Sequence, residues 1–169
     1  LLIILTCVHA TNRRNSGAIQ LIFTILKVAV IVLFCIAAIV LVDSPQPVNF
    51  FPSEGDGALL TSGEFAVALI YVSYAYAGWN AATYLSSELE EPQRTLPWIL
   101  MTGTLVVMTL YVALNFVFLY AASMDSMAGE LEVGYIAAEV AFGDVGGRFT
   151  GIVLAMLLVS TVSAMTMAG

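Results

Sequence analysis

Long apolar runs constrain this chain more than any other feature of its sequence. An α-helix needs about 20 apolar residues to cross the hydrocarbon layer of a bilayer, which is about 30 Å thick. Residues 18–42, 64–85 and 96–122 each meet that length. Residues 1–10 and 150–169 are apolar too, and we expect both to be truncated spans of a longer membrane protein. The sequence therefore predicts an all-α integral membrane protein.

Composition supports the same assignment. Of the 169 residues, 60% are apolar and only 10% are charged, whereas soluble domains average about 45–50% apolar and about 25% charged residues. So few charges cannot cover the surface of a water-soluble globule. The chain is also acidic, with 12 Asp and Glu against 5 Lys and Arg. The low share of charged residues excludes an ordinary cytosolic enzyme. The excess of acidic over basic residues excludes the basic surface of a nucleic-acid-binding protein.

The sequence contains no constellation of catalytic or metal-ligating residues. His9 is the sole histidine, both cysteines lie inside apolar runs, and every acid except Glu64 falls in a predicted loop. Acid–base catalysis or a metal site at membrane depth needs clustered carboxylates, histidines or thiolates. We therefore expect no enzyme, no metal and no cofactor.

The Lys and Arg content of the connecting segments predicts their orientation. Basic residues occur in loops 11–17 and 86–95. The Pro-rich loop 43–63 and the acidic loop 123–147 have none. Because Lys and Arg favour the cytoplasmic side of a membrane, the first two loops are predicted to be cytoplasmic and the other two to lie outside.

Two loops carry local signals for helices. Pro97 suits the first turn of a helix, where its missing N–H costs little, so the following span is expected to begin near residue 96. In the acidic outer loop, apolar residues recur at near-helical spacing, namely Leu131, Tyr135, Ile136 and Phe142. This spacing predicts a short helix that lies against the membrane or caps the helix bundle.

Lys27 is the one ionisable side chain that lies well inside a predicted span. It follows Ala18 by nine residues, or about 13 Å along a helix. Burying such a charge costs about 2.5–3.5 kcal/mol on insertion scales, so Lys27 is expected to face protein or water and to find a partner. Alternatively, it snorkels to the cytoplasmic interface, although its stem reaches only about half of that depth.

A motif of aromatic and small residues lies midway along the predicted span 64–85. Residues 71–80 read YVSYAYAGWN. Small residues four apart, such as Ser73 and Ala77, ordinarily indicate close helix packing. Alternatively, the helix is discontinuous here, and an unwound turn exposes backbone carbonyls to a cavity. Such carbonyls attract ammonium groups, and Tyr74 would then cover the bound ligand.

Hydroxyl groups cluster in the last predicted span, at Ser160, Thr161, Ser163 and Thr166. In membrane helices such hydroxyls most often bond the carbonyl one turn back. Gathered on one helix, they can also coordinate a cation or hold an ammonium group. The sequence leaves both interpretations open.

Three motifs in this order resemble the amino acid–polyamine–organocation permeases, and most closely the L-type amino-acid transporters and their bacterial relatives. They are residues 22–27 (IFTILK), 74–80 (YAYAGWN) and 88–97 (ELEEPQRTLP). The family pattern usually has Gly at Ala77 and Asn at Thr95, and both departures are mild. The resemblance covers essentially the whole chain. It implies part of a bundle of two inverted five-helix repeats, from the end of the fourth helix to the eighth, with a discontinuous sixth helix.

The resemblance also implies a site at the break of the sixth helix. The carbonyls of Tyr74 and Ala77 would receive the α-ammonium of the substrate, and Tyr74 would be an aromatic gate. The full substrate-binding set is Tyr74, Ala75, Tyr76, Ala77, Gly78 and Asn80. The family binds the substrate carboxylate with a break in its first helix, so we expect these residues to form half of a site.

Lys27 has a second role on this resemblance. Its ammonium would stand where sodium-coupled relatives hold a sodium ion, and would tie the fifth helix to the first and eighth. Lys27 is thus a candidate ion-site surrogate or coupling residue, which would suit a proton-coupled carrier or a sodium-independent exchanger. The further candidates at this place are Ser160, Thr161 and Ser163.

The function implied by the resemblance is that of a secondary active transporter, a permease or exchanger, that moves amino acids by alternating access. Its partners would be an amino-acid substrate and the lipid bilayer of a plasma membrane, or of the inner membrane in a bacterium. The sequence does not determine whether an accessory subunit exists. The alternative is a non-transporting membrane subunit or anchor whose polar residues serve only helix packing. That alternative predicts an unbroken helix through residues 75–80 and a Lys27 ammonium that reaches the headgroups.

Overall fold

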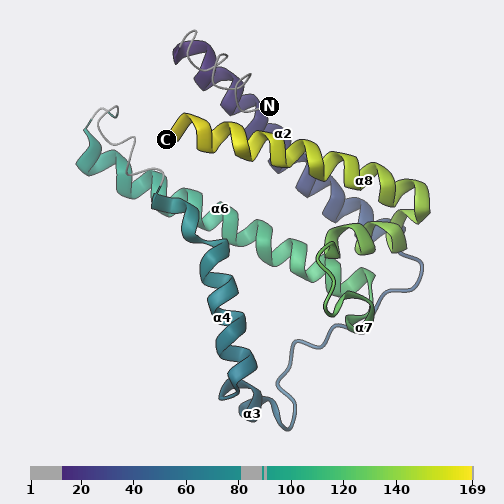
Figure 1. The fold of residues 1–169 in the computed structure, drawn as a ribbon. Helices are drawn as coiled ribbons and strands as arrows, with labels where there is room; N and C mark the ends of the chain where they lie inside the picture. Colours follow the sequence, from purple (N-terminus) through teal and green to yellow (C-terminus); the bar gives the residue numbers. More distant parts are fainter. Residues whose placement is uncertain (1–12, 81–88, 90, 169) are drawn as a thin grey trace. The chain divides into compact units, whose positions relative to one another are not determined.

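The computed structural model describes residues 13–80, 89 and 91–168. Every regular element within these residues is a helix, as Figure 1 shows. The elements are α2 (Arg13–Leu41), α3 (Asp56–Leu60), α4 (Gly63–Ala75), the 3₁₀-helix η1 (Ala77–Asn80), α6 (Pro92–Ala121), α7 (Met124–Met127) and α8 (Val133–Ala168). The predicted all-α class is confirmed, and the predicted span 1–10 lies outside the described residues.

Three described helices are long and apolar enough to cross a membrane. They cover Gln20–Leu41, Pro92–Ala121 and Val133–Val162, with mean hydropathies of 2.9, 2.0 and 1.7, and the last of these ranges joins two helices across a kink at Gly143. Helix α4 has 13 residues, fewer than the roughly 20 that a complete span needs. The predicted span 64–85 continues from α4 into η1, and its last residues lie outside the described part of the chain.

Helix α6 begins earlier than the sequence predicted. It starts at Pro92, ahead of the expected start near residue 96, and ends at Ala121. Glu91 has a left-handed φ of 48° just before the helix. Pro92 then takes the first helical position, where a backbone N–H is not needed. Pro97 consequently lies inside the helix, and the first-turn role expected for it belongs to Pro92.

Helix α8 consists of two limbs separated by Gly143. This glycine has φ 72° and ψ 179°, a backbone conformation that residues with a Cβ rarely adopt. We call residues 133–142 the cap limb and residues 144–168 the long limb. The cap limb and α7 both fall in the predicted outer loop 123–147, where the apolar spacing indicated a short helix. The predicted last span is part of the long limb.

A hydrophobic core forms where α2, α6 and the cap limb meet. The ring of Phe34 on α2 makes edge contacts with Phe118 of α6 and Phe142 of the cap limb, at centroid distances of 6.2 and 5.7 Å. Smaller buried residues surround it, namely Cys35, Ala38, Val42, Val117, Ala121, Ala137 and Ala141. The amide of Gln46 also donates to the carbonyl of Tyr120 at 2.9 Å. The cap limb is therefore packed against two spans.

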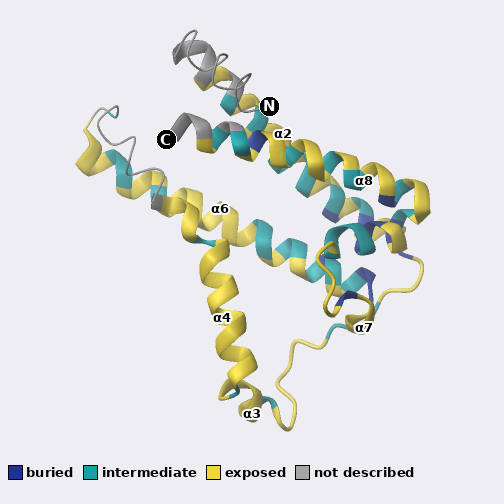
Figure 2. Cartoon of the chain, viewed as in Figure 1, coloured by how far each residue is buried: buried dark blue, intermediate teal, exposed yellow. Residues whose placement is uncertain are grey.

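The chain divides into two compact units. One comprises Leu1–Val48 and Val107–Gly169, and the other comprises Asn49–Val106. In the second unit, α4 begins after Ser62, whose hydroxyl accepts the amide of Phe65 at 3.1 Å. No residue of α4 is buried, and Figure 2 shows the helix exposed along its length.

Candidate functional site

The motif 71–80 lies where α4 gives way to η1. The C-cap of α4 is Tyr76, with φ −99° and ψ 4°. Its amide donates to the carbonyls of Val72 and Ser73, at 3.3 and 3.2 Å, a shared bond that is common at helix termini. The 3₁₀-helix Ala77–Asn80 follows directly. The α-helical hydrogen-bond pattern thus stops within the motif and gives way to a 3₁₀ turn, as is frequent at the C-terminus of an α-helix.

The groups of this motif are mostly open to their surroundings. The side chain of Tyr74 is 75% exposed, and its carbonyl accepts a backbone N–H at the helix terminus. A carbonyl has two lone pairs, so this one can accept a second hydrogen bond. A Cβ added at Gly78 would meet no atom within 4 Å. Of the remaining members, Ala75 and Ala77 are exposed, Tyr76 is half-buried, and the side chain of Asn80 lies outside the described part.

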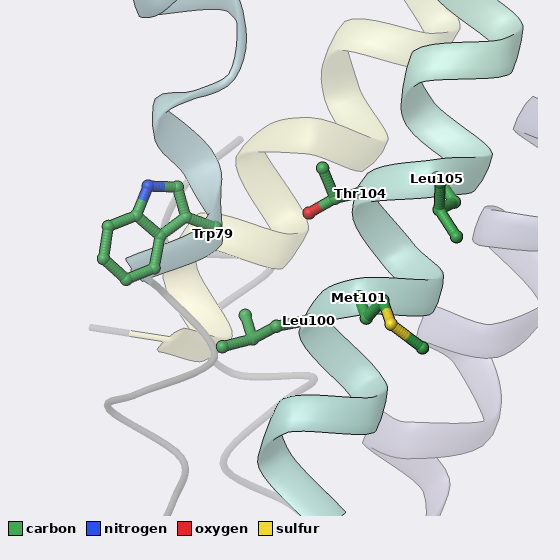
Figure 3. Close-up of a pocket in the computed structure, with 5 residues that line it drawn as sticks. All are labelled: Trp79, Leu100, Met101, Thr104 and Leu105. Carbon is green, nitrogen blue, oxygen red and sulfur yellow. The ribbon is translucent and has the colours of Figure 1, made fainter.

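A cavity of about 350 Å³ lies beside η1. Its lining consists of Trp79 and four residues of α6, which are Leu100, Met101, Thr104 and Leu105 (Figure 3). In Figure 3, Leu100 and Thr104 extend from α6 toward the side on which Trp79 lies. This cavity is a wide-open depression, and its lining is apolar apart from the hydroxyl of Thr104. The sequence analysis did not single out these α6 residues, although their spacing of four residues is the signal that places them on one helix face.

Lys27 on α2 contacts the long limb of α8. Its ammonium Nζ donates a hydrogen bond to Oγ1 of Thr161 at 3.2 Å. The Thr161 hydroxyl in turn donates to the carbonyl of Leu157 at 3.2 Å. Among the described residues, no carboxylate forms an ion pair with Lys27. The lysine therefore extends to a neighbouring helix at membrane depth, and this contact differs from the snorkelling geometry in which the ammonium reaches the headgroups.

Ser160, next to that contact, has a buried hydroxyl without a partner. Its side chain is 2% exposed, and Oγ makes no hydrogen bond within the described part of the chain. By contrast, the hydroxyls of Thr24, Ser73 and Thr161 each donate to the carbonyl four residues back. Leaving a buried hydroxyl unpaired costs about 1–3 kcal/mol. Ser160 is therefore available to a polar group, while the side chain of Ser163 lies outside the described residues.

The candidate residues fall into two groups. Lys27, Ser160 and Thr161 lie in the first compact unit, and the structure brings Lys27 and Thr161 together. Residues 74–80 belong to the second unit. Within the described residues, no three His, Cys, Asp or Glu side chains are grouped so that they could hold a metal ion.

Helices long and apolar enough to cross a membrane, one of which contains a lysine, are typical of an α-helical membrane protein. Comparison with known families makes this specific, because the profile of the amino acid permease family matches residues 1–169. The chain belongs to this family, and the resemblance seen in its three motifs is confirmed. It is accordingly part of an integral membrane protein of the plasma membrane.

Individual relatives point the same way at modest identity. The human b(0,+)-type amino acid transporter 1 is 29% identical over 68% of this chain and 23% of its own length. The serine/threonine exchanger SteT of Bacillus subtilis (strain 168) is 26% identical over 88% of this chain and 33% of its own length. The mouse large neutral amino acids transporter small subunit 2 is 28% identical over 84% of this chain and 27% of its own length.

These relatives are transporters and exchangers, in agreement with the prediction that the chain is not an enzyme. The chain spans between about a quarter and a third of their length. No solved structure gives a significant match.

Proposed function

We propose that this chain is part of a secondary active transporter, a permease or exchanger, that moves amino acids across the plasma membrane by alternating access. The observation that carries this proposal is the end of the α-helical pattern at Tyr76, midway along the predicted span 64–85, in a chain that belongs to the amino acid permease family. A break of the α-helix at membrane depth is tolerated where its backbone faces protein or a cavity. Binding of a substrate by the exposed carbonyl groups would explain why the lost backbone hydrogen bonds are tolerated.

The break supplies the half of the site that binds the ammonium group. The carbonyl oxygens of Tyr74 and Ala77 accept hydrogen bonds from the α-ammonium, and the C-terminal end of α4 adds the negative end of a helix dipole. Tyr74 acts as an aromatic gate over the substrate. The open space around Gly78 lets the ligand approach the backbone closely. The remaining members of the site are Ala75, Tyr76 and Asn80.

Lys27 acts as a surrogate for a metal ion and takes part in coupling. Its ammonium holds α2 to α8 through Thr161, and further donors are left because a lysine ammonium carries three. Ser160 and Ser163 are the other candidates beside it. Placing a charge at this depth is energetically costly, and a charged residue found there is therefore expected to have a function. Proton coupling is one such role, and amino-acid exchange with a fixed lysine charge is the other.

Whether the full-length carrier works with an accessory subunit requires a separate experiment. The mouse relative is named a small subunit, which is a statement about that protein. Co-purification of the full-length carrier from its native membrane, followed by mass spectrometry, shows whether a second polypeptide accompanies it.

Transport by the full-length protein in proteoliposomes tests the proposal. Radiolabelled amino acids are offered to vesicles that contain either unlabelled amino acid or an imposed pH gradient. We expect uptake that saturates and that depends on one of these two conditions. Uptake no faster than in protein-free vesicles, for every amino acid and both conditions, would instead favour the alternative of a membrane subunit or anchor.

A further inference from the structure

The two limbs of α8 fold back on each other as a helical hairpin. A Cβ added at Gly147, in the long limb, would lie 3.2 Å from Cβ of Glu139 in the cap limb. A Cβ added at Gly151 would lie 3.6 Å from the ring of Tyr135. From the first pair of neighbours to the second, the position in the cap limb falls from 139 to 135 while the position in the long limb rises from 147 to 151. The two limbs are therefore antiparallel. Their turn is Gly143, with φ 72° and ψ 179°.

The turn of this hairpin is too close for side chains. A Cβ added at Gly146 would overlap Cβ of Phe142, and one added at Gly147 would also lie 3.3 Å from Cα of Glu139. Contacts of this kind cannot be relieved by turning a flexible side chain, because the atoms belong to or adjoin the backbone. Gly146 and Gly147 therefore let the limbs approach at backbone distance, as small residues do at tight helix interfaces, while Gly143 provides the left-handed backbone of the turn.

Each limb of the hairpin also contacts α2, at a different depth. The cap limb buries Ala137 and Ala141 in the core and sets Phe142 against Phe34 of α2, with ring centroids 5.7 Å apart. The long limb presents Thr161 to Lys27 of α2 at 3.2 Å. Phe34 and Lys27 are seven residues apart, or about 10 Å along the helix. The hairpin thus joins the outer end of α2 to the intramembrane lysine.

We propose that the cap limb and the long limb of α8 move as one rigid hairpin during the transport cycle, so that the packing of the cap limb at Phe34 and the Lys27–Thr161 contact are mechanically coupled. The proposal rests on the proposed function, since a cycle presupposes transport. A well-packed turn without space for side chains has few alternative arrangements. Displacement of the cap limb is therefore passed to Thr161 instead of being absorbed at Gly143.

A reversible cross-link within the hairpin tests this directly. The double variant Glu139→Cys/Gly147→Cys joins positions whose Cβ distance of 3.2 Å is a few tenths of an ångström below the usual range for a disulfide. The full-length carrier is oxidised in proteoliposomes, the bond is verified by mass spectrometry after alkylation, and uptake is measured before and after reduction. The two single variants serve as controls, and Gly147→Cys alone measures the loss of uptake caused by the added Cβ at this tight contact, so that only the change between the oxidised and reduced double variant reports on the cross-link.

We expect the cross-link to form and the oxidised carrier to keep uptake within about twofold of the reduced form, because a bond between parts that never separate costs nothing. Uptake that oxidation abolishes and reduction restores would overturn the proposal, since the limbs would then have to part. A folded carrier in which no cross-link forms would overturn it too. Absence of uptake in the unmodified carrier would count against the proposed function instead.

A second variant pair does not depend on the double cysteine. Gly146→Ala introduces the overlap with Phe142, whereas Gly151→Ala in the same limb adds a Cβ at an ordinary contact distance of 3.6 Å. We expect Gly146→Ala to lower uptake about tenfold or more at equal membrane insertion, because an extra methyl group in a tight contact forces the surrounding backbone to shift. Gly151→Ala should stay within about twofold. Equal uptake in both variants would overturn the proposal.

Discussion

Two regions of the molecule differ in how their polar groups are exposed and bonded. One is the seam between α2 and α8, and the other is the break between α4 and η1. In the seam, Lys27 finds Thr161 at 3.2 Å, and Ser160 is almost completely buried. At the break, Tyr74 is 75% exposed and Gly78 faces open space. In the seam, a contact between side chains of this chain joins two helices, although the Ser160 hydroxyl stays without a partner among the described residues. At the break, the side chain of Tyr74 and the backbone at Gly78 are exposed, and these are the groups proposed to bind the substrate.

Removal of the lysine charge should have the largest effect. Lys27→Ala in the full-length carrier loses the bond to Thr161 and the charge at membrane depth, so we expect uptake to fall by at least about two orders of magnitude, as for loss of a buried charge interaction worth about 3 kcal/mol. Uptake at matched membrane expression measures this. Arg148→Ala is the control, because Arg148 pairs with Asp144 at the exposed surface at 3.1 Å, and it should transport normally. Unchanged kinetics in Lys27→Ala would contradict the role given to the seam.

The gate should come next in size. Tyr74→Ala removes the aromatic face over the proposed ammonium site, and we expect the KM for uptake to rise about tenfold, since such contacts are worth about 0.5–2 kcal/mol. Tyr71→Ala is a matched control, because Tyr71 is a tyrosine of the same helix with 71% exposure and no role in the site. If both variants change KM alike, the effect belongs to the helix and not to a gate.

A glycine exchange separates folding from binding at the break. Because a Cβ at Gly78 would meet no atom within 4 Å, Gly78→Ala should leave the thermal unfolding temperature nearly unchanged. Close approach of a substrate to the backbone would however be hindered, and we expect KM to rise severalfold, by roughly 1 kcal/mol. Gly103→Ala in α6, equally free of neighbours, should alter neither quantity. A normal KM in Gly78→Ala would mean that no ligand approaches there.

The smallest effect should come from Ser160. Its hydroxyl is buried without a partner among the described residues, so Ser160→Ala removes an unsatisfied group and should leave stability unchanged or raise it by about 1 kcal/mol. Thermal unfolding of the detergent-solubilised carrier measures this. A clear loss of stability would reveal that the hydroxyl is bonded in the full-length protein, and would make Ser160 part of the Lys27 network.

Sequence reasoning predicted long apolar helices at 18–42 and 96–122, and the structure has long helices there, because length and apolarity alone decide whether a helix can cross a bilayer. It predicted a short helix in the outer loop 123–147 but not the burial of Ala137 and Ala141 against α2 and α6, because Glu139 and Asp144 make this segment look exposed to solvent and alanines mark a buried helix face only weakly. The corner at Gly143 was missed for another reason. Its signal is the spacing of Gly143, Gly146 and Gly147, which acquires meaning only when the two limbs are seen in contact.

The candidate site was predictable only in part. Depth marked Lys27 as a residue that needs a partner, but its partner lies 134 residues away along the chain, and no local pattern links the two. The resemblance to a family supplied the expectation of a tie to the eighth helix, and the contact with Thr161 agrees with it. The α6 residues beside Trp79 were not found, because an apolar helix face that lines a cavity looks in sequence like one that lines a core.

Competition for uptake by an amino acid and by its α-hydroxy analogue tests the central claim most directly. The two differ at the α-position, where the analogue has a hydroxyl in place of the ammonium that the carbonyls of Tyr74 and Ala77 are proposed to receive. We expect the amino acid to compete at least about a hundredfold more strongly, because a site built for a charged donor rejects an analogue that lacks it. Equal competition by the two compounds would contradict the account.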